Sequence, residues 1–400
     1  MNTNNREGLD ELRKNFSDIP FSIILKADVI TNGIKINKDI ILAQRWFFTN
    51  FFYLPDKTNI LAMYNRESPY EIKFENKKFH LLYENQIISQ IFLLEIPNYI
   101  KEIKPDQSIL FSQRSSHCAY VSPINACQYF FKNEQCKFCN FNDAWEHLEN
   151  KKIVANEELL TKITSKAIEE VGLNQLKLTG GALYNIDREA EIYISIAKKL
   201  KEETKIEHLF AYPQALKKEH FERLKEVGVE EICIDLEIWD ERIWKNILPA
   251  KGHIGREKWI NRMIDATDIF GVGQVSTSIV AGYDYVSGCF ESIENSLRSN
   301  VEGFAWLVDK GIVPVFFAYM PSHSLVEKSK NEIVLPTSYA LKLVASLHNI
   351  FLDNDIYKLL GYNTNGDKTL EKCVCRDCGY HNLIVDFPAL CMNSVNEHIR

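Results

Sequence analysis

Residues 127–139 read Cys127-Gln-Tyr-Phe-Phe-Lys-Asn-Glu-Gln-Cys136-Lys-Phe138-Cys139. Three thiolates on one loop can hold three irons of a [4Fe–4S] cluster and leave the fourth iron open, whereas a fourth cysteine would close the cluster for electron transfer alone. An open iron can bind a substrate or a cofactor, much as a catalytic zinc does at its free position. The loop can therefore hold an iron–sulfur cluster at Cys127, Cys136 and Cys139, with one open coordination position. A zinc knuckle and isolated reduced thiols are the alternatives.

Most of the cysteines are grouped. The chain has ten, of which four lie within 118–139 and four within 373–391. The first residues contain no apolar segment of a signal peptide, so we expect a cytoplasmic location. Because disulfides are rare in that reducing compartment, metal binding is the first explanation to test for grouped thiols. Cys118 precedes Cys127 by the same spacing that separates Cys127 from Cys136, so it is either an alternative ligand or a buried residue of a strand.

From about residue 111 onward, short apolar segments alternate with amphipathic ones. Strands that alternate with helices at this spacing imply right-handed crossovers and a parallel sheet. Six such units can curl into part of a barrel, whose chemistry lies at the C-terminal ends of the strands. The expected strands are Ser116–Val121, Gln175–Thr179, Ile206–Tyr212, Glu231–Leu236, Val272–Val280 and Val313–Tyr319. The expected helices are Asn156–Val171, Asp187–Glu203, Gln214–Val227, segments within Glu241–Phe270, Gly288–Lys310 and Thr337–Leu352.

The first 110 residues have a different pattern. Their short apolar runs, including Phe21–Leu25, Lys78–Tyr83 and Gln86–Glu95, are rich in aromatic and β-branched residues, which favours strands. The sequence therefore predicts an α/β chain in three parts. These are a β-rich N-terminal domain (1–110), a partial (β/α)6 TIM-like barrel (111–355) and a small C-terminal metal-binding extension (356–400).

Charge and hydropathy restrict the partners. The net charge of −7 does not indicate a nucleic-acid-binding protein, whose binding domain is usually basic. The most apolar stretches, such as Gln86–Ile96, are too short to span a bilayer. We therefore expect neither nucleic acid nor a membrane as partner, and a small molecule or a peptide as substrate.

The cysteine loop resembles the signature of the radical S-adenosylmethionine (radical SAM) superfamily. In that signature two residues separate the last two of three cysteines, and an aromatic residue precedes the final one, as Cys136, Phe138 and Cys139 do here. The first spacing differs, because eight residues rather than three lie between Cys127 and Cys136. Longer first arms do occur in the superfamily. The resemblance covers about Ser116–Pro321 and implies a partial barrel with a [4Fe–4S] cluster and SAM as cofactors.

One strand end resembles the superfamily's Gly-Gly-Glu motif, in which backbone oxygens accept hydrogen bonds from the amino group of SAM. Thr179-Gly180-Gly181 matches it, although Ala182 replaces the acid. Phe138 is expected on the adenine side of SAM. A simple turn also explains two adjacent glycines at the end of a strand, because glycine tolerates close approach of other backbone.

Two further strand ends carry polar matches. Glu237 resembles the superfamily's contact to the ribose of SAM, with Asp235 as the second candidate. Ser276 or Ser278, on the fifth predicted strand, is a candidate for the SAM carboxylate. The alternative explanations are solvated or helix-capping acids and barrel hydroxyls that neighbouring groups satisfy.

A second group of cysteines follows the last predicted barrel helix. A Cys-x-x-Cys-Gly segment followed by a further cysteine can close around one metal centre. Many radical SAM enzymes carry an auxiliary iron–sulfur cluster near the C-terminus, and structural zinc is the competing interpretation. The softness of the thiolate ligands favours the cluster. The candidate ligands are Cys373, Cys375, Cys378 and Cys391.

The resemblance implies that SAM is cleaved by one electron from the reduced cluster, giving a 5′-deoxyadenosyl radical that removes hydrogen from a substrate. Flavodoxin or ferredoxin is the expected electron donor. Two other classes remain open: a zinc-binding α/β-barrel protein, and an iron–sulfur electron-transfer or scaffold protein that does not cleave SAM. The sequence assigns no catalytic side chain. Tyrosines at strand ends are candidates for substrate contact or plain packing residues, namely Tyr184, Tyr212, Tyr283 and Tyr319.

Overall fold

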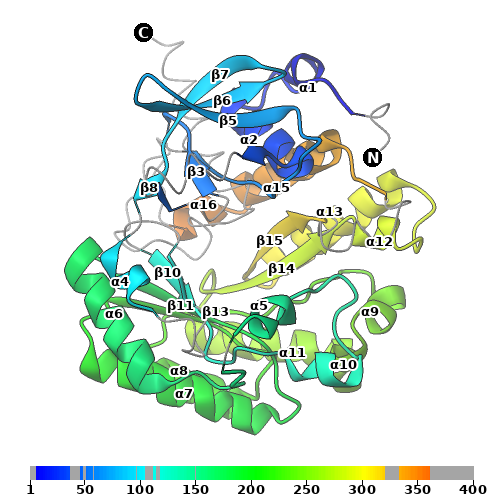
Figure 1. The fold of residues 1–400 in the computed structure, drawn as a ribbon. Coiled ribbons are helices and arrows are strands. Elements are labelled where there is room, and N and C mark those ends of the chain that lie inside the picture. Colours follow the sequence, from blue (N-terminus) through cyan, green and yellow to red (C-terminus); the bar gives the residue numbers. More distant parts are fainter. Residues whose placement is uncertain are drawn as a thin grey trace.

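The computed structural model describes residues 6–36, 46–47, 51–56, 58–95, 97–103, 111–113, 118–148, 150–319 and 333–360. Its main sheet consists of β9 (Phe111–Gln113), β10 (Cys118–Val121), β11 (Gln175–Thr179), β12 (His208–Tyr212), β13 (Glu231–Cys233), β14 (Val275–Ala281) and β15 (Ile312–Ala318). The strands lie in the order β15-β14-β13-β12-β11-β10-β9 (Figure 1). Strands β10 to β15 are parallel, and β9 pairs antiparallel with β10. Because β9 and β15 do not pair within the described residues, the sheet is an open, partial barrel.

The predicted parallel sheet is confirmed. Each of the six predicted strands contains or overlaps one of β10 to β15, and β11 has the predicted bounds. Strand β13 ends at Cys233 instead of Leu236, because its pairing with β14 is interrupted there by an irregularity described below. The antiparallel edge strand β9 was not predicted.

Helices connect the parallel strands, and several have side-chain caps that define where they begin. Asn156, Asn185 and Ser292 each accept a hydrogen bond from the backbone N–H three positions later. The helices of this part are α5 (Asn142–Glu146), α6 (Glu157–Val171), α7 (Ile186–Glu203), α8 (Lys218–Glu226), α9 (Glu241–Ile247), α10 (Pro249–Ile254), α11 (Arg256–Phe270), α12 (Tyr283–Val286), α13 (Ile293–Asp309), α15 (Thr337–Asp353) and α16 (Ile356–Leu359).

The described N-terminal residues form helices and short strands. These elements are α1 (Leu9–Asn15), α2 (Phe21–Asn32), β1 (Lys35–Ile36), β2 (Trp46–Phe47), β3 (Phe51–Tyr53), β4 (Asn59–Leu61), β5 (Tyr70–Glu75), β6 (Lys78–Tyr83), β7 (Gln86–Ile91), β8 (Leu94–Glu95) and α4 (Asn98–Lys101). Two of the predicted runs are strands, but the prediction of a strand at Phe21–Leu25 was wrong, because these residues begin α2. Residues 23–30 of α2 are all buried, and an apolar run buried on every side lacks the periodicity that separates a helix from a strand.

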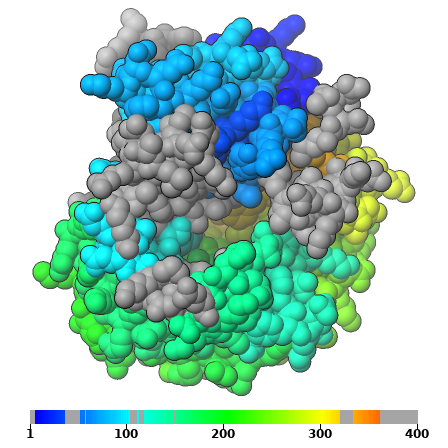
Figure 2. All heavy atoms as spheres, viewed as in Figure 1, coloured from blue at the N-terminus to red at the C-terminus, as the bar shows by residue number. Residues whose placement is uncertain are grey.

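The four-stranded sheet β1-β5-β6-β7 lies over α2 and α15, at one end of the molecule, while the barrel strands β10 to β13 lie toward the other end (Figures 1 and 2). Asp28, a buried residue of α2, connects the two helices. Its carboxylate accepts hydrogen bonds from the Thr337 hydroxyl at 2.6 Å, the Asn32 amide at 2.8 Å and the Tyr70 hydroxyl. Burial raises the pKa of Asp28. Polar as well as apolar contacts therefore hold the N-terminal part on α15.

Replacing Asp28 by alanine is expected to lower the free energy of unfolding by about 2–3 kcal/mol, because the buried hydroxyls of Tyr70 and Thr337 lose their acceptor. Urea denaturation followed by circular dichroism measures the change. Asp268→Ala, at an exposed position of α11, serves as the control and should stay within about 0.5 kcal/mol of the wild type. Equal stabilities of the two variants would contradict the assigned role of Asp28.

The C-terminal part is described only to residue 360. The predicted ligands Cys373, Cys375, Cys378 and Cys391 lie outside the described residues. Within the described part of the chain, no helix is both long and apolar enough to cross a membrane.

Candidate functional site

The cysteine loop begins where β10 ends, at the C-terminal edge of the parallel sheet. Asn142, at the start of α5, holds the first cysteine: its Oδ1 accepts from the Cys127 N–H at 2.8 Å, and its Nδ2 donates to the Cys127 carbonyl at 3.2 Å. Asn142 is buried, so these bonds take the place of water. The Cys139 N–H donates to the Cys136 carbonyl at 3.0 Å, which closes the tight turn between these two cysteines.

The long first arm of the loop has a defined structure. Its residues Gln128–Lys132 form the 3-10 helix η2. The Gln128 N–H donates to the Ala182 carbonyl after β11 at 2.8 Å, and the Ala250 N–H of α10 donates to the Glu134 carbonyl at 3.1 Å. The arm is therefore attached to the end of β11 on one side and to α10 on the other, so the unusual spacing does not leave the first cysteine loosely held.

The three thiols influence one another electrostatically. Burial is the main cause that raises the pKa of Cys127, Cys136 and Cys139, in the last case to about 12. The charge of Cys127 raises the pKa of the other two thiols further, whereas Lys251 lowers the pKa of all three. The Phe141 N–H also donates to the Cys139 sulfur at 3.4 Å. A metal centre that binds the sulfurs in place of their protons would offset the free-energy cost of burying them as thiolates.

The donor atoms of the cysteine loop suit an iron–sulfur cluster. Among the described residues, no group of three His, Cys, Asp or Glu side chains is arranged to hold one metal ion. A [4Fe–4S] cluster has a separate iron for each cysteine, so its ligands need not converge on one point. Three neighbouring thiols, one N–H donor to sulfur and a nearby cation therefore fit an iron–sulfur cluster.

Gly180 and Gly181 lie against the backbone that leads into the first cysteine. A Cβ on Gly181 would lie 2.4 Å from the backbone nitrogen of Cys127, and one on Gly180 would lie 2.6 Å from the Ile124 carbonyl oxygen. The Gly181 N–H donates to the Ile124 carbonyl at 2.7 Å. Close backbone approach therefore requires glycine at both positions, in addition to any contact with a ligand.

A β-bulge follows directly after β13. Cys233 pairs with Ser276, but the next pairing joins Glu237 to Ile279, so the segment after β13 has one residue more than β14 in this interval. The Glu237 N–H donates to the Ser278 carbonyl at 2.8 Å, and Glu237 has a φ of 70°. A non-glycine residue in this left-handed region is strained, and such strain concentrates at functional sites.

The bulge brings the predicted acids and serines together. The Asp235 carboxylate accepts from the Ser278 N–H and from the Cys233 thiol, both at 3.3 Å. Ser276 is 2% exposed and Ser278 is 8% exposed, so both side chains are buried. Glu237, by contrast, has a side chain that is 17% exposed, and its Oε1 accepts from the ammonium group of Lys251 at 2.9 Å.

Comparison with known protein families finds a match over the part of the chain that contains the cysteine loop. Residues 121–295 match the model of the Radical SAM superfamily. The chain contains a radical SAM domain. Radical SAM proteins use a [4Fe–4S] cluster and SAM. No curated protein matches the sequence.

Solved structures of two hydrogenase maturases and one synthase are similar to parts of this chain, each at 16% identity. One HydG structure, described as a maturase of the [FeFe]-hydrogenase, has a TM-score of 0.45 over 58% of this chain and 49% of its own. The methylornithine synthase PylB has a TM-score of 0.42 over 58% and 62%. HydG from Carboxydothermus hydrogenoformans has a TM-score of 0.44 over 65% and 64%. The chain thus spans about half to two thirds of the length of these structures.

In this radical SAM domain, Phe138 belongs to a series of three aromatic rings. It contacts Tyr283 with ring centroids 5.2 Å apart, and Tyr283 contacts Tyr319 at 4.8 Å, both edge to face. The rings connect the cysteine loop with the ends of β14 and β15. Two of the tyrosines expected at strand ends are therefore brought beside the predicted adenine-side residue.

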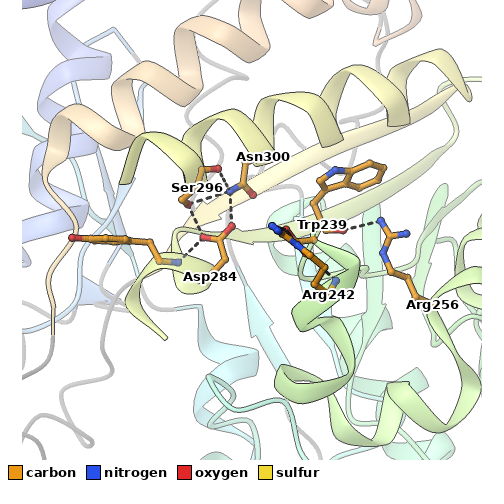
Figure 3. A network of polar contacts seen from close by, with 8 residues as sticks. Trp239, Arg242, Arg256, Asp284, Ser296 and Asn300 are labelled. Carbon is orange, nitrogen blue, oxygen red and sulfur yellow. Dashed lines mark hydrogen bonds and ion pairs between the residues drawn. The ribbon is translucent and has the colours of Figure 1, made fainter. Parts of the chain in front are cut away.

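The turn that carries Tyr283 is held by its neighbour Asp284, which is 3% exposed (Figure 3). The Asp284 carboxylate accepts from the Ser296 hydroxyl at 2.6 Å and from the Asn300 amide at 3.2 Å, both on α13. Figure 3 also shows the Arg256 guanidinium donating to the Trp239 carbonyl, at 2.7 Å, just after the bulge. Buried hydrogen bonds thus fix the loops after both β13 and β14.

The sequence analysis missed two buried charged residues near this radical SAM site. Glu189 accepts hydrogen bonds from the backbone N–H groups of Leu183 at 2.8 Å and Gln214 at 2.9 Å, joining the loops after β11 and β12. Lys251 is only 8% exposed although it lies on a short helix. Neither residue belongs to a spaced motif. The only sequence signal for Glu189 is its position four residues after Asn185, the cap of α7, and there is none for Lys251.

Proposed function

We propose that the chain cleaves SAM reductively at a [4Fe–4S] cluster held by Cys127, Cys136 and Cys139. The bound cluster would supply the electron that breaks SAM into methionine and a 5′-deoxyadenosyl radical, which removes hydrogen from a small molecule or a peptide. The observation that carries this proposal is the position of the three coupled thiols: they lie on one loop, at the C-terminal edge of the parallel sheet, inside the radical SAM domain.

We assign roles around SAM from the contacts of each residue. The backbone carbonyls of Thr179, Gly180 and Gly181 would accept from the amino group of SAM, and the two glycines lie against the backbone that leads into Cys127. Glu237 would accept from the ribose hydroxyls, and Asp235 would support the same bulge. Of the serines, Ser278 is the more exposed and is the better candidate for the carboxylate, while Ser276 would support the strand. Phe138, with the two tyrosine rings that follow it, would exclude water on the adenine side.

An anaerobic assay tests this function. The purified chain, incubated with SAM and dithionite, is expected to contain about four irons per cluster and to release 5′-deoxyadenosine and methionine, both measured by mass spectrometry. Cys139→Ala should abolish both iron binding and cleavage, because an open cluster needs all three thiolates. Zinc in place of iron would overturn the proposal in favour of the zinc-binding alternative. Iron without any SAM cleavage would favour an electron-transfer or scaffold protein.

Several parts of the proposal concern regions beyond this site. The division into residues 1–110, 111–355 and 356–400 remains a proposal, as do the cytoplasmic location and flavodoxin or ferredoxin as the electron donor. An auxiliary cluster or a zinc ion at the C-terminal cysteines also remains a proposal. The ratio of iron to zinc in the wild-type chain distinguishes the two, since only an auxiliary cluster adds iron beyond the first.

A further inference from the structure

Lys251 has an environment that is unusual for a lysine. Its ammonium group donates to the Asp235 carbonyl at 2.7 Å and to the Glu237 carboxylate at 2.9 Å. The same group lies 4.8 Å from the centroid of the Trp259 ring. Lysine is rarely buried unless it is paired, because removing its charge from water is costly. The burial of Lys251 therefore needs an explanation. Both of its hydrogen-bond acceptors belong to the β-bulge.

The bulge needs support from outside the sheet. Its residues 234–237 leave the regular ladder, so several of their polar groups find partners elsewhere. The Leu236 N–H donates to the Thr277 hydroxyl at 2.9 Å, and the Leu236 carbonyl accepts from the Trp244 indole at 3.0 Å. The Asp235 carbonyl and one oxygen of the Glu237 carboxylate both accept hydrogen bonds from the ammonium group of Lys251. The two hydrogen bonds from Lys251 thus offset the free-energy cost of the left-handed backbone conformation at Glu237.

The helix that carries Lys251 also contacts the cysteine loop. The Ala250 N–H of α10 donates to Glu134 in the first arm, and the Lys137 N–H donates to the Ile247 carbonyl at the end of α9, at 3.1 Å in both cases. Residues 247–251 therefore contact the cysteine loop through the backbone and the bulge through one side chain. The two parts of the SAM site are connected through this short segment.

We propose that Lys251 is a positioning residue: it fixes the bulge so that the second oxygen of Glu237 faces SAM, and it places a positive charge beside the three thiolates. Oε1 of Glu237 takes the bond from Lys251, so Oε2, which has no hydrogen bond within the described residues, is the oxygen left for the ligand. The inference rests on the proposed function for its ligand. The bulge itself does not depend on the ligand, so the two can fail separately.

The first test needs no cluster. Amide hydrogen exchange, measured by mass spectrometry on the full chain as purified, compares the wild type with Lys251→Met and with the matched control Lys245→Met. Lys245 is an exposed lysine on α9, so its replacement changes the charge equally without reaching the bulge. Lys251→Met is expected to raise exchange by about tenfold in peptides that cover 234–240 and 276–282, and Lys245→Met to leave it unchanged. Unchanged exchange in Lys251→Met would overturn the positioning role.

The second test uses the reconstituted protein. The dissociation constant of SAM is read from the change that SAM causes in the electron paramagnetic resonance spectrum of the reduced cluster. Lys251→Met is expected to keep its iron, to bind SAM about ten- to hundredfold more weakly and to have a more negative midpoint potential. Lys251→Arg, which keeps the charge, should restore most of the potential. Wild-type affinity and potential in Lys251→Met would overturn the proposal.

Both results remain interpretable if the strongest variant is unstable. Lys251→Gln retains one donor and should fall between the wild type and Lys251→Met in exchange and in SAM affinity. If the wild type itself binds no iron, the proposed function fails, and the exchange experiment alone decides on Lys251. If the wild type cleaves SAM but Lys251→Met and Lys245→Met behave alike, only the assignment of Lys251 fails.

Discussion

A Cys127→Ala variant is expected to contain less than a tenth of the wild-type iron and to release no detectable 5′-deoxyadenosine. Three thiolates are needed to hold a cluster with one open iron, and two leave it exposed to loss. The variant should still fold, because the buried bonds between Asn142 and position 127 involve only the backbone of that residue. Iron analysis, the visible absorption of the cluster and the SAM-cleavage assay measure the effect.

Cys118→Ala is the control that separates the two candidates for the first ligand. Cys118 begins β10, pairs with Gln175 and is fully buried, so it lies at the opposite end of the strand from the cysteine loop. We expect this variant to retain its iron and its activity and to lose about 1–2 kcal/mol of stability from the cavity. Loss of iron in Cys118→Ala, with retention in Cys127→Ala, would reverse the assignment.

Gly181→Ala is expected to reduce both bound iron and SAM cleavage by at least tenfold. The new methyl group would lie 2.4 Å from the Ala126 carbonyl carbon and equally close to the Cys127 nitrogen, and neither backbone atom can move without displacing the first ligand. The effect is therefore steric and acts on the cluster, before any loss of a hydrogen bond to SAM. Iron content and the SAM dissociation constant, measured on the same preparation, separate these contributions.

Gly172→Ala is the matched control for a glycine substitution in the same barrel. Gly172 ends α6 with a φ of 67°, and a Cβ there would meet no atom within 4 Å. Alanine should cost about 1 kcal/mol of stability from its backbone conformation and leave the iron content unchanged. If Gly172→Ala lost iron to the same extent as Gly181→Ala, general destabilisation rather than the close contact would be the cause.

Much of the barrel could be predicted because its strands and helices alternate at a spacing that only a parallel sheet accommodates. The helix α2 could not, because its apolar residues are buried on all sides and show no helical periodicity. The cysteine loop could be recognised in the sequence because cysteines that bind one metal centre occur at restricted spacings. Lys251 was not, because a lysine that pairs with a bulge through space has no required position in the sequence.

Glycines 180 and 181 show a further limit of motif reading. Their resemblance to a SAM-binding segment concerns contacts with a ligand, whereas the structure shows contacts with the loop that precedes the first cysteine. Contact with a ligand and contact with this loop both require glycine at the same two positions, and the sequence alone does not distinguish between them. The β-bulge at Glu237 is similar: its effect on β13 depends on the partner strand, which local sequence does not describe.

The hydrogen bond between Asp28 and Thr337 joins positions that are 309 residues apart in the chain. During synthesis on the ribosome, α2 emerges long before α15, so the apolar surface that α15 covers stays exposed until nearly the whole barrel has been translated. Nascent chains of this protein should therefore depend on chaperones over that interval, and fragments that end before α15 should aggregate rather than accumulate as a folded N-terminal unit.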